Sequence, residues 1–144
     1  MDDNDGRSCV DVLDESACWA LLRSVEVGRL AIAIAHDPQI FPVNHVVDHG
    51  TLVFRTAEGS KLAGVVDAPV VAYEADGADA STGEVWSVVV RGRADRIRNV
   101  HELAATFGLP LFPWQGGRKE HFVRIVPATV TGRRFRKVPD TDRA

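Results

Sequence analysis

The sequence predicts a mainly β protein, in which an antiparallel sheet closes into a barrel and carries three short helices. Apolar residues alternate with polar or small ones in six or seven segments, the pattern of half-buried strands. Short clusters of turn residues separate most of these segments, as in hairpins. Long helical patterns do not alternate with the strands as they would in a parallel sheet. A closed antiparallel barrel accounts for all three observations.

The chain begins and ends with polar, unpatterned residues. We expect mobile tails over 1–11 and 139–144 and a single domain over 12–138. The domain opens with an amphipathic helix over 13–24, for which Asp14 is a suitable N-cap. The apolar residues of this helix have the spacing of one buried stripe, and they are Cys18, Leu21, Leu22 and Val25.

Six further segments complete the predicted barrel. We expect a strand over 29–35, turn residues over 36–39, and a hairpin between 40 and 57 that turns at Asp48-His49-Gly50. Later strands are expected over 70–75, 84–95, 121–126 and 129–137, with an exposed loop over 76–83 and a break at Pro127. Short helices are expected over 61–66 and 99–107, and in the strand over 84–95 we expect Trp86, Val88 and Val90 to share one face.

The segment 40–62 is the most informative for function, because a hairpin leads directly into the start of a helix. A helix N-terminus offers unpaired N–H groups and a positive dipole, which suit a phosphate. Ser60 and Lys61 would lie there, with Arg55 and Thr56 near the end of the preceding strand. The alternative is an ordinary helix start, in which Ser60 caps the helix and Lys61 is solvated.

The overall charge disfavours two classes of partner. Seventeen basic and twenty acidic residues give a net charge of −3, which argues against sequence-independent binding to nucleic acid or anionic membranes. The basic residues near the C-terminus alternate between two strand faces and so form no single patch. Cys9 and Cys18 have no metal-binding spacing. His45, Asp48 and His49 cross from a strand into a turn, and such a segment does not bring i and i+4 side chains together as a helix does. No signal peptide or membrane-spanning segment is evident, so we expect a cytoplasmic protein.

Six fragments together carry a family resemblance. They are VGRLAIAI, PVNHVV, LVFRTAEGSKL, VVAYEADGAD, EVWSVVVRGRAD and RIVPATVTGRRF, and they cover roughly residues 13–136. In this combination and order the chain resembles the pyridoxamine 5′-phosphate oxidase-like, flavin-binding split-barrel proteins. The resemblance is to the small actinobacterial and nitroimidazole-resistance-type branch in particular.

The resemblance implies a homodimer with a flavin at the subunit interface. The cofactor would be FMN, or in some relatives an 8-hydroxy-5-deazaflavin coenzyme. Residues Pro42, Val43, Asn44 and His45 would then run along the flavin ring, and Trp86 and Ser87 would lie near the ring edge. The ribityl phosphate would be held by Phe54, Arg55, Thr56, Ser60 and Lys61. Trp114 could line a substrate pocket or seal the dimer, and no residue of the chain is implied as catalytic.

Two functions from different classes remain open on this basis. The first is an oxidoreductase that uses FMN or a deazaflavin to act on a small molecule. The alternative is a non-catalytic binding or sensing protein that retains the split barrel. His45 and the single lysine of the phosphate segment, Lys61, motivate this alternative.

Overall fold

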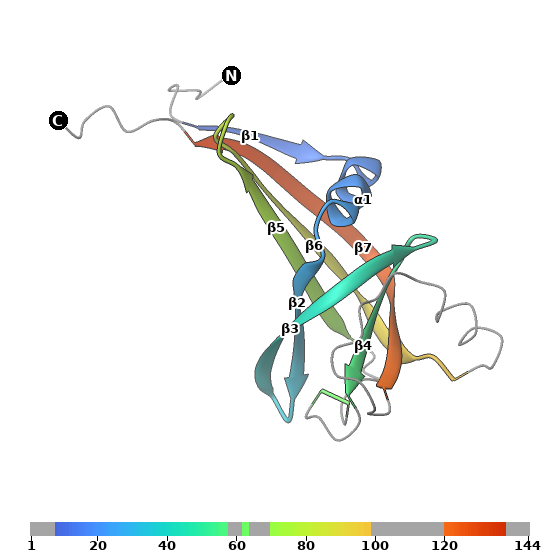
Figure 1. The fold of residues 1–144 in the computed structure, drawn as a ribbon. Coiled ribbons are helices and arrows are strands. Elements are labelled where there is room, and N and C mark those ends of the chain that lie inside the picture. The colour runs from blue at the N-terminus through green and yellow to red at the C-terminus, as the bar shows by residue number, and fades with distance from the viewer. Residues whose placement is uncertain (1–7, 58–61, 64–69, 99–119, 138–144) are drawn as a thin grey trace.

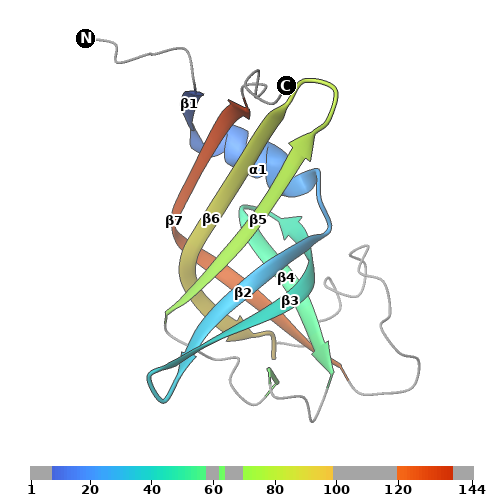
Figure 2. The same cartoon turned by 90° about the vertical axis from the view of Figure 1, so that its left-hand side faces the viewer.

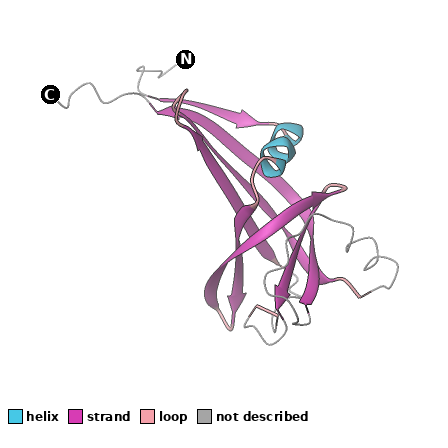
Figure 3. Cartoon of the chain, viewed as in Figure 1, coloured by secondary structure: helices cyan, strands magenta, loops and turns pink. Residues whose placement is uncertain are grey.

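The computed structural model describes residues 8–57, 62–63, 70–98 and 120–137, and in this part of the chain one helix accompanies an antiparallel sheet (Figures 1 and 3). The helix is α1 (Glu15–Arg23). The strands are β1 (Ser8–Leu13), β2 (Val27–Ile34), β3 (Asp37–Asp48), β4 (Thr51–Ala57), β5 (Val71–Asp79), β6 (Glu84–Arg96) and β7 (Glu120–Lys137).

The sheet closes on itself. Its strand order is β1-β7-β4-β3-β2-β5-β6, and β6 also pairs with β7. This last pairing joins β6 back to β7 and closes the barrel, as the sequence predicts, while β1 is an additional strand that pairs with β7 alone. The long strand β7 pairs with β4 near its start and with β1 near its end, while β6 follows it over most of its length. As a result β1 and the ends of β5, β6 and β7 project beyond the rest of the barrel (Figure 2).

Two tight turns fix the registers of the hairpins β2–β3 and β3–β4. Ala35 and His36 have φ values of 50° and 66°, and His49 and Gly50 have values of 48° and 71°. Two consecutive positive φ values suit the right-handed twist of a two-residue hairpin. The predicted turn at Asp48-His49-Gly50 is confirmed, whereas the turn expected over 36–39 is tighter, because β3 already begins at Asp37.

The structure corrects three boundaries. Residues 8–13 form β1 rather than the end of a tail, because their backbone pairs with β7 from Ser8 to Leu13. Strand β5 extends to Asp79, so half of the expected loop over 76–83 is strand. The two strands expected on either side of Pro127 are one strand. Pro127 lies opposite Gly92 at a shift of register between β6 and β7, where a residue without an N–H is tolerated. The helices expected over 61–66 and 99–107 fall mainly or entirely outside the described residues.

The main core fills the barrel and extends under α1. Leu30, Phe54, Tyr73, Val88 and Val90 are fully buried in it. Helix α1 begins as predicted, since the Asp14 side chain accepts a hydrogen bond of 2.8 Å from the Ala17 N–H. The helix contributes Cys18, Trp19 and Leu22 to the core, whereas Leu21 and Val25 are only partly buried. In the described part of the chain, no helix is long and apolar enough to span a membrane.

Candidate functional site

Strand β3 presents two faces, and they divide the residues predicted to line a flavin ring. Pro42 and Asn44 lie on the outer face of the barrel, where Pro42 is exposed and Asn44 half-buried. Val43 and His45 point inward and are buried. Of the four, therefore, Pro42 and Asn44 present side chains to a ligand on the outer face, while Val43 can offer only backbone atoms.

The ring of His45 belongs to the core. The side chain is 4% exposed, its Nε2 lies 2.8 Å from the carbonyl oxygen of Leu22, and its Nδ1 is hydrogen-bonded to the Tyr73 hydroxyl. Burial lowers the pKa of His45, an effect that the bond to Leu22 only partly offsets. A contact between this ring and a flavin on the outer face does not fit the structure, because both ring nitrogens are occupied inside the barrel.

The end of β4 carries the described part of the predicted phosphate segment. Phe54 is fully buried, Arg55 is half-buried on the opposite face, and Thr56 is 5% exposed. Within the described residues, the Thr56 hydroxyl has no hydrogen-bond partner. A buried hydroxyl left in this state costs about 1–3 kcal/mol, which a hydrogen bond to a ligand would recover. Thr56 shares the inward face of β4 with Phe54, so its hydroxyl can meet a phosphate only at the end of the barrel, where β4 ends at Ala57. Ser60 and Lys61 lie outside the described residues.

Trp86 and Ser87 lie far along the barrel from Thr56. The distance can be followed along β7, because Thr56 pairs with His121 of this strand and Trp86 pairs with Arg134. Thirteen residues separate these two partners, roughly 40 Å of strand at about 3.3 Å per residue. Figure 1 shows the same separation, with the end of β4 at the bottom and the β5–β6 turn at the top. A single subunit therefore does not bring Thr56 and Trp86 to one small ligand.

Trp86 is held in place by a glycine on the neighbouring strand. Its indole lies across Gly77 of β5, where an added Cβ would lie 2.7 Å from the indole nitrogen. Trp86 faces inward with the buried Val88 and Val90, as predicted, while Ser87 faces outward. Trp114 lies outside the described residues.

A shallow hollow of about 260 Å³ lies on the outer face of β2, β3 and β5. Ala31 and Ala72 are neighbours across the strands there, and Ile40 is 68% exposed beside them. Arg29 bridges Glu74 and Asp76 at 3.0 and 3.1 Å along one side. Pro42 is the cross-strand neighbour of Arg29, so this hollow adjoins the outward residues of β3.

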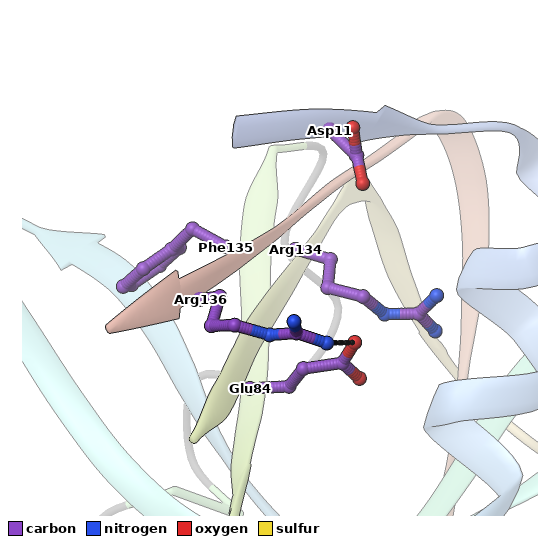
Figure 4. A pocket seen from close by; sticks show the side chains of 5 residues that line it. All are labelled: Asp11, Glu84, Arg134, Phe135 and Arg136. Carbon is purple, nitrogen blue, oxygen red and sulfur yellow. Dashed lines mark hydrogen bonds and ion pairs between the residues drawn. The ribbon is translucent and has the colours of Figure 1, made fainter. Parts of the chain in front are cut away.

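A second hollow, of about 250 Å³, lies where β1, β6 and β7 project beyond the barrel (Figure 4). Arg136 contacts Glu84 at 3.4 Å, and Arg134 and Asp11 are cross-strand neighbours. Phe135 points away from the two arginines. This hollow was not predicted, because Asp11 was expected to lie in a mobile tail. The alternation of Val10, Asp11 and Val12 was the available signal.

The end of the β3–β4 hairpin is fixed to β7 by an ion pair. Arg124 contacts Asp48 at 2.9 Å and donates a hydrogen bond of 2.6 Å to the Thr51 hydroxyl. Burial alone would raise the pKa of Asp48, but hydrogen bonds from Arg124 and His49 hold it below its usual value. His49 is 95% exposed at this turn while His45 points into the core, so these two histidines and Asp48 do not converge on one point.

These features define a class of protein, a closed antiparallel barrel with one short helix in the described part of the chain. Residues 14–134 match the family model of pyridoxamine 5′-phosphate oxidase. The chain belongs to this family, and its fold is the split barrel that the sequence predicts.

Several similar proteins come from Corynebacterium and Mycobacterium species. A Corynebacterium glutamicum protein provisionally named a pyridoxamine 5′-phosphate oxidase is 40% identical, with a TM-score of 0.81 over 91% of this chain and 96% of its own. The FAD binding protein of Mycobacterium smegmatis is 42% identical, with a TM-score of 0.77 over 87% and 97% of the two chains. The uncharacterized protein Rv3129 of Mycobacterium tuberculosis is 40% identical over 69% of this chain and 88% of its own.

The predicted link to nitroimidazole resistance is a distant one. A Bacteroides thetaiotaomicron protein provisionally named a 5-nitroimidazole antibiotic resistance protein is 12% identical, with a TM-score of 0.69 over 89% of each chain. This likeness extends to the fold alone. The actinobacterial part of the predicted branch is the part that the identities of about 40% support.

Proposed function

We propose that the protein binds a flavin nucleotide between two subunits and acts as an oxidoreductase on a small molecule. The observation that carries the proposal is the buried Thr56 hydroxyl, without a partner among the described residues, at the start of the predicted phosphate segment. The 42% identity to an FAD binding protein supports a flavin and adds FAD to the predicted FMN and deazaflavin.

In this proposal the protein supplies binding and orientation. A bound flavin accepts and returns electrons itself, so the chain needs no nucleophile of its own. Thr56 would donate a hydrogen bond to the phosphate, and Lys61 would add a charge-assisted contact. Pro42 and Asn44 would flank the ring on the outer face of β3. The hollow beside Ala31 and Ala72 would leave room for ligand or partner.

We further propose that the site is completed by a second copy of the chain. The distance along β7 between Thr56 and Trp86 supports this, because both could border one ligand only if they came from different subunits. The outer face of β2, β3 and β5 also exposes large apolar side chains next to Pro42, as expected of an interface. These are Val27 on β2 and Ile40 on β3, with exposed fractions of 51% and 68%, and Val70, which directly precedes β5, is 77% exposed.

Ile40→Arg is expected to convert a dimer into a monomer of 15.7 kDa. The substitution places a charge at the centre of the apolar face, where it would be buried without a partner on association. Sedimentation equilibrium measures the mass directly. Val12→Arg is the matched control, because Val12 is 84% exposed but lies on β1, away from this face. A wild-type protein that sediments as a monomer with and without flavin would contradict the proposed interface.

Thr56→Val is expected to change stability and flavin affinity in opposite directions. Valine keeps the shape of threonine and removes the unpaired hydroxyl, so the flavin-free protein should gain up to about 1 kcal/mol in its free energy of unfolding. Loss of a hydrogen bond to a charged phosphate should weaken flavin binding about tenfold or more. Urea denaturation and fluorescence titration with FMN, FAD and the deazaflavin coenzyme measure the two effects. Thr131→Val, at an exposed position of β7, should change neither.

The titration also separates the two functions. Binding of one flavin that Thr56→Val and Lys61→Ala both weaken would support the site, and reduction of the bound flavin followed by reoxidation with a small acceptor would support the oxidoreductase. Tight binding without such turnover would favour the non-catalytic binding protein. If none of the three ligands binds, the proposal is wrong.

A further inference from the structure

Three elements meet at the ring of His45. The ring is on β3, the Tyr73 hydroxyl comes from β5, and the Leu22 carbonyl belongs to the last turn of α1. A carbonyl oxygen can only accept, so Nε2 must carry the proton and donate to it. Nδ1 of the neutral ring is then the acceptor for the Tyr73 hydroxyl. Of the two neutral tautomers of His45, the described contacts therefore select the one with the proton on Nε2, and burial favours the neutral ring.

The bond to Leu22 performs a specific task for α1. The last four carbonyl groups of a helix have no partner within it, and Leu22 O is one of these in a helix that ends at Arg23. Leu21 O accepts from the N–H and the hydroxyl of Ser24. His45 thus caps the C-terminal end of α1 from inside the barrel, and its own backbone N–H donates to Glu26 O at 2.8 Å, just beyond the helix.

The surroundings of His45 do not favour a positive charge. Tyr73 and Cys18 are the other titratable side chains buried in the described core, and burial raises the pKa of both, so both remain neutral at physiological pH. The charged residues of the packed elements lie at the surface or in ion pairs elsewhere. They are Glu15, Arg23 and Glu26 around α1, Arg29 with Glu74 and Asp76 on β2 and β5, Asp48 with Arg124 at the end of β3, and Arg55 on the outer face of β4.

We propose that His45 is an acid-sensitive latch, whose neutral ring holds α1 against the barrel and whose protonation releases α1 while the barrel stays folded. A second proton on Nδ1 would face the Tyr73 hydroxyl, which now donates to that atom. The cation would also remain in an apolar core without a counter-ion. Opening of the structure beside the ring would let water solvate the charge.

Helix α1 is the element that can move away. Strands β3 and β5 are each hydrogen-bonded to neighbours on both sides, so displacement of either would break two ladders. Helix α1 has nine residues, too few for a helix to be stable alone, and it is held mainly by the packing of Cys18, Trp19 and Leu22 and by the bond from His45. Figure 1 shows it at one end of the barrel, between β1 and the β3–β4 turn, where it is not a member of the sheet.

The ring of His45 binds a proton less readily in the native state than in the open state, in which α1 has moved away. Acid therefore favours the open state. The latch is fully closed above the ordinary pKa of histidine, about 6.5. Below that value, each pH unit down to the lowered native pKa should increase the opening equilibrium about tenfold, because one proton is taken up on opening.

Hydrogen exchange measured at several pH values tests the latch in the full-length protein. Protection factors, which are corrected for the intrinsic pH dependence of exchange, should fall about tenfold per pH unit below 6.5 for amides of α1. Those of β2 and β6 should stay constant over the same range. His45→Gln can make both hydrogen bonds without titrating and should abolish the fall. His49→Gln, at the 95% exposed histidine, should behave like the wild type.

Three outcomes would overturn the proposal. The first is a parallel fall in α1 and in the strands, which would mean that acid unfolds the whole protein. The second is a fall in α1 protection that persists in His45→Gln. If His45→Gln does not fold, NMR titration of the His45 ring in the wild type takes the place of this variant. The third outcome is then a titration midpoint of the ring that differs from the pH midpoint of α1 opening.

Discussion

Gly28→Ala is expected to lower the free energy of unfolding by about 3 kcal/mol or more. Gly28 lies on β2 directly against the ring of Tyr73, and a Cβ there would lie 2.2 Å from the Tyr73 hydroxyl oxygen and 2.3 Å from Cζ. Tyr73 is fully buried and bonded to His45, so its ring cannot turn aside without breaking that bond. The methyl group therefore disturbs both packing and hydrogen bonding, which places the effect at or above the usual cost of overpacking.

Urea denaturation measures this loss, and Gly50→Ala is the matched control. Gly50 has a φ of 71° and nothing within 4 Å of an added Cβ, so alanine there should cost only about 1 kcal/mol of backbone strain. Tyr73→Leu shortens the side chain that meets the new methyl group. Gly28→Ala should consequently cost much less in a Tyr73→Leu background than in the wild type. Equal costs in the two backgrounds would contradict a clash with Tyr73.

Local patterns were sufficient to predict the central elements of this fold. The Asp48-His49-Gly50 turn, the inward face of β6 and the Asp14 cap each depend on a few neighbouring residues, and all three are confirmed. Strand β1 depends instead on a partner more than 100 residues away, since Ser8 pairs with Lys137. The break expected at Pro127 was wrong for a similar reason, because only the pairing of β6 with β7 shows that Pro127 lies at a shift of register.

In the candidate site, too, some features could be predicted from neighbouring residues and others depend on the folded barrel. Alternation along β3 already placed His45 on the apolar face with Val43 and Val47, and this signal was available in the sequence. The family resemblance nevertheless assigned His45 to the ligand, because a motif specifies positions in the chain and not which way each side chain points. The unpaired hydroxyl of Thr56 could not be predicted in this way, because it depends on which groups the closed barrel brings near it.

The losses in the free energy of unfolding caused by single replacements of His45 and Tyr73 should add up to more than the loss caused by the double replacement. His45→Leu leaves the Tyr73 hydroxyl and the Leu22 carbonyl without a partner in the core, and we expect it to lower the free energy of unfolding by about 2–4 kcal/mol. Tyr73→Phe leaves only Nδ1 of His45 unsatisfied and should cost about 1–2 kcal/mol. In the double variant only the Leu22 carbonyl lacks a partner, so its cost should fall below the sum by about 1 kcal/mol or more.

The double-mutant cycle is measured by urea denaturation at pH 8, where His45 is neutral and the latch is closed. His49→Asn controls for the loss of a histidine and should change stability by no more than about 0.5 kcal/mol, because His49 is 95% exposed and asparagine tolerates its φ of 48°. Additive costs would contradict a direct hydrogen bond between the two side chains. Repeating the cycle near pH 5.5 adds a second condition. The wild type should lose stability relative to the His45 variants, because its histidine then binds a proton on unfolding that leucine cannot bind.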